Sequence, residues 1–189
     1  MLTPAVYAAG KLTPLSPLPE GTHTITYALT DVAGNTSTSP ALSITIDTAA
    51  TSAPTVAIAE AADGVSAGEA ANGVALTVTV PANARVGDVV TTLVTAPNGT
   101  TSTLSYTLQT GDLPPAQGGT SSGGPNFTIT QTVPLETLRP SSIYLDGAWT
   151  TSTTITDPAG NTSPADADGF TLAANTPTVS IATVAGDNT

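Results

Sequence analysis

The sequence predicts an all-β fold, and three observations support this class. Thr, Ser, Ala, Val, Gly and Pro make up most of the 189 residues, including 17 Gly and 16 Pro. Thr and Val favour strands because a branched Cβ packs well on a pleated surface, whereas Gly and Pro favour turns. Short runs rich in Val, Ile and Thr alternate with turn residues, and no long stretch has apolar residues at helical spacing. We therefore expect strands and no long helix.

The most complete series of strand-like runs lies between residues 54 and 173. Turn residues separate the runs, and Asn98-Gly99 is a strong hairpin signal between two of them. About seven short strands in roughly 120 residues is the pattern of an immunoglobulin-like β-sandwich. The expected strands are 54–59, 73–80, 87–96, 101–110, 126–133, 147–156 and 168–173.

The chain repeats itself at the length of a domain. The heptad DVAGNTS at 31–37 returns as DPAGNTS at 157–163, with an offset of 157 − 31 = 126 positions. Upstream of the heptads, the match extends without a gap to an acid–glycine pair. This pair is Glu20-Gly21 in the first copy and Asp146-Gly147 in the second. An offset of this size indicates repeated domains rather than a short repeat.

A second repeat sets the frame of the array. The segments around Pro54 and Pro177 are similar, with an offset of 177 − 54 = 123 positions. Two independent repeats with nearly the same period predict tandem modules. We expect 1–49 to be the C-terminal part of an immunoglobulin-like module, 50–174 to be a complete module, and 175–189 to be the first strand of the next module.

Charge and residue types exclude several functions. Fourteen acids and three bases give a net charge of −11, so the chain has no basic surface for nucleic acid. No run is long and apolar enough to insert into a membrane. The chain has no cysteine, which excludes disulfides and thiolate metal sites. The only histidine, His23, stands at the repeat position of Trp149, and a general base is rarely replaced by tryptophan, so we expect no enzyme.

Strand alternation places the repeated side chains on one face of each copy. We expect the apolar members of each set to point into a sandwich. The heptad aspartate then lies where the strand ends, beside the neighbouring module. The sets are His23, Ile25, Tyr27, Leu29 and Asp31 in the first copy, and Trp149, Thr151, Thr153, Ile155 and Asp157 in the second.

The heptad has two interpretations, which the sequence leaves open. Asp caps its own backbone, and Gly and Asn tolerate positive φ, so the heptad fits a plain turn. Alternatively, the aspartate is a ligand of Ca²⁺, which binds about six to eight oxygen atoms. One loop supplies only part of that shell, so the other ligands must come from the linker and the next module. The predicted metal ligands are Asp31, Asp47, Asp63, Asp157, Asp166, Asp168 and Asp187.

These acids fall into two groups, one for each expected joint. Asp31, Asp47 and Asp63 belong to the first joint. The second joint has Asp157, Asp166, Asp168 and Asp187. A Ca²⁺ ion held between the end of one module, its linker and the start of the next would stiffen the joint.

The junctions resemble those of giant bacterial adhesins secreted by type I systems, the biofilm-associated and RTX-type adhesins. In that family a strand ends in D-x-A-G-N-T-S, a second strand ends in an I-D-T linker, and a P-T-V strand opens the next immunoglobulin-like module. Here these motifs are residues 31–37, 46–48 and 54–56. The resemblance implies extender modules whose joints are rigidified by Ca²⁺. By position Asp31 and Asp47 match the family, but Ala173 stands where the second linker aspartate is expected.

Two functions follow from this reading. The first is a structural extender on the bacterial cell surface that supports cell adhesion and biofilm formation. Its partners are neighbouring modules of the same chain, while other regions contact a host-cell or abiotic surface. The alternative is a module that binds a glycan or a protein through its loops. A buried Trp149 favours the extender, whereas an exposed one favours ligand binding.

Overall fold

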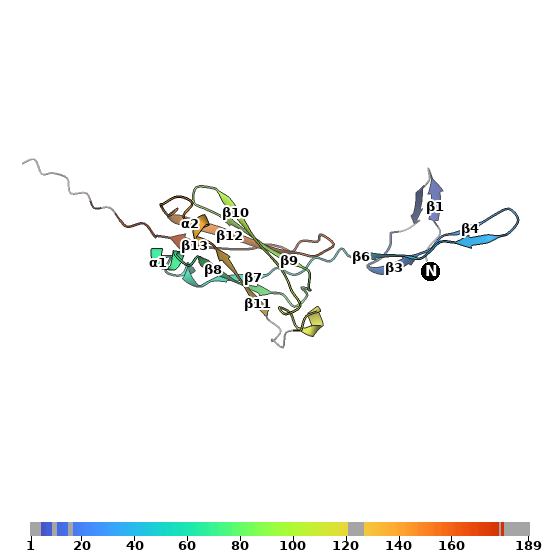
Figure 1. The fold of residues 1–189 in the computed structure, drawn as a ribbon, viewed down its shortest axis with the longest axis horizontal. Coiled ribbons are helices and arrows are strands. Elements are labelled where there is room, and N and C mark those ends of the chain that lie inside the picture. Colours follow the sequence, from blue (N-terminus) through green and yellow to red (C-terminus); the bar gives the residue numbers. More distant parts are fainter. Residues whose placement is uncertain (1–4, 9–10, 15–16, 121–126, 178, 180–189) are drawn as a thin grey trace, which may run out of the picture. The chain divides into compact units, whose positions relative to one another are not determined.

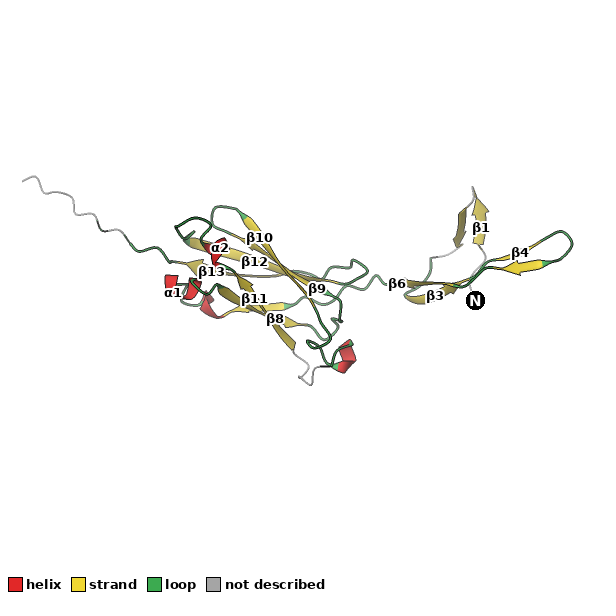
Figure 2. Cartoon of the chain, viewed as in Figure 1, coloured by secondary structure: helices red, strands yellow, loops and turns green. Residues whose placement is uncertain are grey.

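The structure is a computed structural model that describes residues 5–8, 11–14, 17–120, 127–177 and 179. The chain folds as two compact units, residues 1–49 (unit 1) and 50–189 (unit 2), which are considered separately (Figure 1). Strands dominate both units, as the yellow arrows of Figure 2 show. The predicted all-β class is therefore confirmed.

Unit 2 consists of two antiparallel sheets, and a strand forms in each of the seven predicted runs. In spatial order, the larger sheet contains β10 (Thr101–Thr107), β9 (Val89–Thr95), β12 (Gly147–Thr156) and β13 (Asp166–Leu172). The smaller sheet contains β11 (Phe127–Val133), β8 (Val74–Val80) and β7 (Thr55–Ile58). This arrangement of four and three strands is an immunoglobulin-like β-sandwich.

Alternating side chains build the core between the two sheets. Along β8 the odd-numbered and even-numbered positions differ, since Val78 is buried and its neighbour Thr77 is exposed. Trp149 and Phe170 face each other in the register of β12 and β13, and their rings stack with centroids 5.8 Å apart. At one side of the sandwich the Asp166 carboxylate accepts the Val56 N–H at 2.7 Å, which ties β13 to β7.

Among the described residues of unit 2, only single helical turns interrupt the strands. They are α1 (Ala67–Ala70), α2 (Leu135–Leu138) and the 3₁₀ turns Ala59–Ala61 and Pro115–Gln117. A capping box between Ser66 and Glu69 begins α1. Within the described ranges, no helix is long and apolar enough to cross a membrane.

Unit 1 is built from β-hairpins. The first pairs β1 (Ala5–Ala8) with β2 (Lys11–Pro14). In the second, β3 (Gly21–Ile25) pairs with β6 (Leu42–Ile46), and β4 (Ala28–Thr30) pairs with β5 (Thr36–Thr38) further along the same hairpin. This second hairpin, residues 21–46, is the repeat of β12 and β13.

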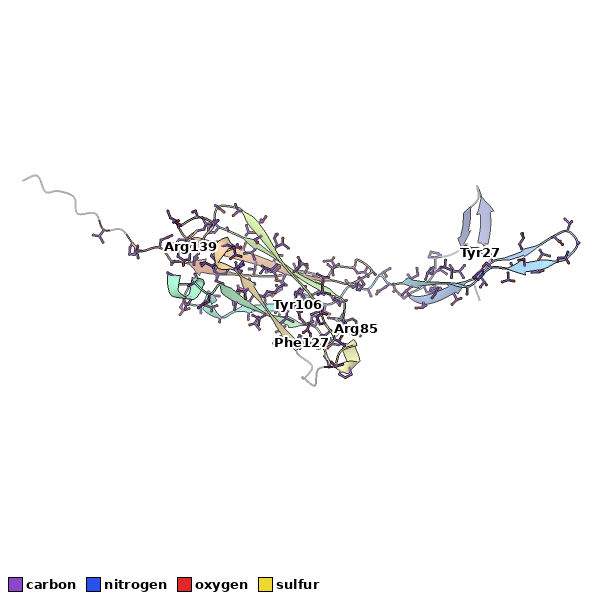
Figure 3. All side chains as sticks on the ribbon, viewed as in Figure 1. Tyr27, Arg85, Tyr106, Phe127 and Arg139 are labelled. Carbon is purple, nitrogen blue, oxygen red and sulfur yellow. The ribbon has the colours of Figure 1, made fainter. Side chains whose placement is uncertain are left out.

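The apolar face of hairpin 21–46 differs from the sequence prediction. Tyr27, Leu29 and Leu42 are 46%, 77% and 57% exposed, and Figure 3 shows the Tyr27 side chain on the hairpin. The equivalent face of β12 is buried in unit 2. The predicted burial is therefore correct for the second copy and wrong for the first, because no described sheet of unit 1 covers this face.

Candidate functional site

Each heptad forms a turn that is closed by its own aspartate. Asp31 Oδ1 accepts the N–H groups of Ala33 and Asn35, both at 2.9 Å, and Asp31 Oδ2 accepts Asn35 Nδ2 at 2.8 Å. Asp157 makes the same pair of contacts with Asn161, at 2.9 Å to the backbone N–H and 2.8 Å to Nδ2. The two heptads are therefore one structure built twice.

The same hydrogen bonds keep both aspartates ionised. The side-chain amide of Asn35 is the main cause that lowers the pKa of Asp31, and that of Asn161 lowers the pKa of Asp157. Backbone N–H groups of each turn act in the same direction. The negative charge thus stabilises the turn itself, as the plain-turn interpretation predicts.

After each heptad turn, a serine–proline pair on the returning part of the hairpin binds the strand that precedes the turn. Ser39 Oγ accepts the Tyr27 N–H at 3.0 Å, and Ser163 Oγ accepts the Ile155 N–H at 2.9 Å. Both hydroxyls donate to the carbonyl of the following proline. Asp31 precedes Ser39 by eight positions, and Asp157 precedes Ser163 by six (39 − 31 = 8; 163 − 157 = 6). The segment between the aspartate and the serine is therefore two residues longer in the first hairpin, which is one repeat of strand alternation.

The heptad turn and the linker lie at opposite ends of hairpin 21–46. Gly21 pairs with Ile46 at the base, next to the linker, whereas Thr30 pairs with Thr36 beside the turn. Nine strand positions separate the two levels (30 − 21 = 9), which corresponds to about 30 Å. The prediction that Asp31 and the linker residue Asp47 share one joint is therefore wrong.

In unit 2 the heptad turn lies at the end where the chain enters the sandwich. Thr55, the first residue of β7, pairs with Thr79 at the end of β8, and Thr156 at the end of β12 pairs with Val89 at the start of β9. We call this the entry end; it comprises residues 51–55, the loop 81–88 and the turn 157–161. The Asp157 turn thus neighbours the linker that precedes unit 2.

The opposite end of unit 2, the exit end, is where the chain leaves the sandwich. The N–H of Val65 donates to Thr171 O at 2.8 Å, and the N–H of Ala173 donates to Val65 O at 2.9 Å. Asp63 precedes Val65 by two positions, so it lies at the exit end. Within unit 2, Asp63 therefore lies at the end opposite the Asp157 turn, and its predicted role as a metal ligand stays a prediction.

Among the described residues of unit 2, Asp166 and Asp168 lie on β13, some positions away from the Asp157 turn. Asp166 and Asp168 lie opposite Thr153 and Thr151, four and six positions before Asp157 along β12 (157 − 153 = 4; 157 − 151 = 6). Asp168 Oδ1 accepts the N–H of Gly169, and Asp47 Oδ1 accepts the N–H of Ala49. Asp187 lies outside the described residues, as does most of the predicted strand at 175–189.

We tested whether the acids fit a Ca²⁺ ion within either unit. Among the residues that the structure describes, no group of three or more Asp, Glu, His or Cys side chains is placed to hold a metal. Ca²⁺ needs about six to eight oxygen ligands, and both heptad carboxylates already accept N–H groups of their own turns. The described acids of a single unit therefore do not fit a calcium site.

Glu20 and Asp146, which had no predicted role, lie at the open ends of the two repeated hairpins, one in each. Glu20 accepts the N–H of Thr48 at 3.0 Å and also its hydroxyl, whereas Asp146 accepts the N–H groups of Ala174 at 2.8 Å and Asn175 at 3.1 Å. Thr48 and Ala174 are themselves 126 positions apart (174 − 48 = 126). The sequence does show the acid–glycine pair at the start of each copy, but the pair alone does not reveal which N–H group the acid binds.

Further contacts hold the same segment at the exit end of unit 2. Asn175 accepts the Tyr144 N–H at 3.2 Å and donates from Nδ2 to Tyr144 O at 2.9 Å. The Arg139 guanidinium, labelled in Figure 3, lies 5.2 Å from the centre of the Tyr144 ring. Residues 173–175 are therefore fixed to the sandwich by five hydrogen bonds, to Val65, Asp146 and Tyr144.

Trp149, whose exposure distinguishes an extender from a ligand-binding module, is buried. Its side chain is 2% exposed, and its indole Nε1 donates to Leu145 O at 3.0 Å. His23 occupies the same position in hairpin 21–46, opposite Ile44, and its Nε2 lies 2.7 Å from Pro19 O. Trp149 thus belongs to the core and offers no ring to a ligand.

The two sheets define unit 2 as an immunoglobulin-like β-sandwich, the class expected from the sequence. Residues 4–48 match the family model described as a bacterial Ig-like domain. The match covers about a quarter of the chain and agrees with the predicted type of module. No curated protein matches the chain.

Several solved structures are similar to the chain, including the following two. The tetra-tandem repeat in the extending region of a large adhesion protein is 20% identical, with a TM-score of 0.45 over 86% of this chain and 34% of that one. A Ca²⁺-stabilized adhesin that helps an Antarctic bacterium reach out and bind ice is 24% identical, with a TM-score of 0.36 over 84% and 33%. The chain thus spans about a third of the length of each.

Proposed function

We propose that the chain is a non-enzymatic extender segment of a large bacterial surface adhesin, as the junction motifs suggested. One observation carries this proposal. The hairpins at 21–46 and 147–172 repeat the same turn, the same register and the same terminal carboxylate contact at one offset of 126. Tandem copies of one module, joined end to end, are what a spacer requires and what a single binding domain does not.

The proposal assigns three modules to the chain. Residues 1–49 are the C-terminal part of a first module, 50–174 are a complete module, and 175–189 open a third. The register supports the first assignment, because His23 faces Ile44 as Trp149 faces Phe170. The exposed apolar face of hairpin 21–46 is then the face that a second sheet covers in a complete module.

The burial of Trp149 argues against the alternative of a ligand-binding module. Sugar-binding sites commonly use an exposed aromatic ring, and the single tryptophan of the chain is stacked on Phe170 inside the core. The proposed partners are therefore the neighbouring modules. Adhesion to a host-cell or abiotic surface and biofilm formation are assigned to the protein as a whole, outside the bacterial cell.

Calcium is proposed to bind at the joints between modules, but the acids assigned to each joint differ from those expected from the sequence. Asp47 lies in the linker before unit 2, and Asp157 lies at the entry end of that unit, so these two acids belong to one joint. Asp31 belongs to the joint before unit 1, and Asp63 and Asp187 to the joint after unit 2. Asp166 and Asp168 stay within the sandwich, where each already accepts a backbone N–H.

Thermal unfolding of the chain in EDTA, Ca²⁺ and Mg²⁺ tests the metal. A ligand that binds only the folded state at about 100 times its Kd adds roughly 2.7 kcal/mol of stability. We expect a rise specific to Ca²⁺ that Asp47→Asn abolishes. Asp31→Asn is the matched control, because it removes the same charge at the far end of hairpin 21–46. The absence of any Ca²⁺ shift would remove calcium from the proposal.

The extender role itself is tested by the distance between the units. The chain has no cysteine, so single cysteines at Ser43 and Thr103 can carry spin labels without background. A joint stiffened by Ca²⁺ gives a narrower distance distribution in Ca²⁺ than in EDTA. Identical distributions, together with binding to a glycan or protein array, would favour the ligand-binding alternative.

A further inference from the structure

The carboxylates of Glu20 and Asp146 have equivalent surroundings in the two units. Each precedes a glycine that begins the first strand of the repeated hairpin, and each accepts the N–H that lies two positions beyond the end of the second strand. That N–H belongs to Thr48 in unit 1 and to Ala174 in unit 2. In both places the acceptor is charged and the donor is the first part of the linker.

The glycine explains how the acid reaches the linker. Gly21 has φ +112° and Gly147 has φ +131°, values that side chains other than glycine rarely adopt. This conformation turns the chain just before the strand, so the preceding carboxylate faces the end of the partner strand. The acid and the glycine therefore act together, which accounts for their joint repetition at one offset.

Unit 2 separates the contribution of the carboxylate from that of the sheet. Ala173 is held by a backbone bond to Val65, as part of the sandwich edge. The next two N–H groups, of Ala174 and Asn175, have no strand partner and are accepted by the two oxygens of Asp146. The carboxylate thus extends the ordered chain beyond the last strand.

We propose that the acid–glycine pair is a metal-independent anchor that fixes the start of the linker to the module it leaves. A linker that begins free can point in many directions, whereas a linker whose first N–H groups are held leaves the sandwich in one direction. This inference rests on the proposed array of modules. It differs from the calcium joint because the groups involved are one carboxylate and backbone N–H groups of the same module.

Amide hydrogen exchange of the full chain in EDTA tests the anchor. We expect Asp146→Asn to speed exchange at Ala174 and Asn175 by about tenfold, since each loses a hydrogen bond to a charged acceptor. The amide of Ala173 is the internal control, because its acceptor is Val65 O. Glu20→Gln should act in the same way on the Thr48 amide.

A second variant guards against a general loss of structure. Unit 1 uses glutamate at this position, so Asp146→Glu retains the carboxylate and should retain the slow exchange at Ala174. Unchanged exchange in Asp146→Asn would overturn the anchor. Equal acceleration at Ala173 would also overturn it, because the carboxylate would then support the sandwich edge and not the linker. Neither result depends on calcium or on the adhesin role, so the two proposals fail separately.

Discussion

The Thr92 hydroxyl of β9 donates a 2.5 Å hydrogen bond to Gln131 Oε1 of β11, across the two sheets of unit 2. Thr92 Oγ1 also lies 2.8 Å from Thr153 Oγ1, and Gln131 Nε2 donates to Val90 O at 3.3 Å. All three side chains are buried. Antibody domains join their sheets with a disulfide, whereas this chain has no cysteine and joins its sheets with a buried polar network.

Gln131→Met tests that network. The substitution keeps the length of the side chain but removes the acceptor for Thr92 and the donor for Val90. A buried polar group without a partner costs about 1–3 kcal/mol, so the free energy of unfolding of unit 2 should fall by that amount. Thr130→Val, on the exposed face of the same strand, should change it by less than about 0.5 kcal/mol. Equal stability of the two variants in urea unfolding would contradict a stabilising role.

Trp149→Ala tests the core assignment of the tryptophan. Removing a buried ring costs about 3–5 kcal/mol, and the stack on Phe170 is lost with it. We expect a large loss of stability in unit 2, measured by circular dichroism during urea unfolding. His23→Ala is the comparison, because it makes the equivalent change in unit 1 and should leave the unit 2 transition in place. A small effect of Trp149→Ala would mean that the ring is not packed.

Gly147→Ala tests the backbone geometry at the start of β12. An alanine at φ +131° is strained, and its Cβ would lie 3.0 Å from Pro97 Cγ. Strain of this kind costs about 1–3 kcal/mol. At Gly111 an added Cβ meets nothing within 4 Å, so Gly111→Ala should lower the stability by no more than a few tenths of a kcal/mol or raise it by less than about 1 kcal/mol. Thermal unfolding of the two variants distinguishes local strain from a general cost of alanine.

The heptad turn of unit 2 should open in acid. The Asn161 side chain is the main cause that holds the pKa of Asp157 below its ordinary value of 3.8. A carboxyl group with a lowered folded pKa contributes its full stability above the ordinary value and loses it as the pH falls through the lowered value. We therefore expect the Asn161 amide to lose exchange protection only below pH 3.8. Asp157→Asn should remove this pH dependence. Protection of Asn161 that persists at lower pH in the unmodified chain would contradict the prediction.

The pattern of residues was sufficient to predict the strands of unit 2. Val, Ile and Thr alternate along each run, and Gly, Pro or Asn-Gly separates the runs, so local propensity and turn chemistry agree at every boundary. Seven strands formed where seven were expected. The single turns at Ala67–Ala70 and Leu135–Leu138 were not expected, because four residues are too few to show a helical period.

The repeat predicted the equivalence of the two hairpins but not their surroundings. The heptads have one sequence and form one turn, since their hydrogen bonds join residues at most four positions apart. Burial depends on a covering sheet instead. Ile155 is 0% exposed in unit 2, whereas Leu29, at the equivalent position of hairpin 21–46, is 77% exposed. No local signal distinguishes the two faces.

The sequence by itself determined the all-β class, the approximate positions of the strands in unit 2 and the repeated turn, because these depend on propensity and on contacts between near neighbours. Only the tertiary structure decided where each acid lies and which groups it contacts. An antiparallel strand carries the chain from one end of the sandwich to the other, so Asp31 and Asp47 lie at opposite ends of hairpin 21–46. The same geometry brings Asp146 to Ala174, which are 28 positions apart, across the open end of a hairpin. Proximity along the chain and proximity in space differ whenever a strand lies between two residues.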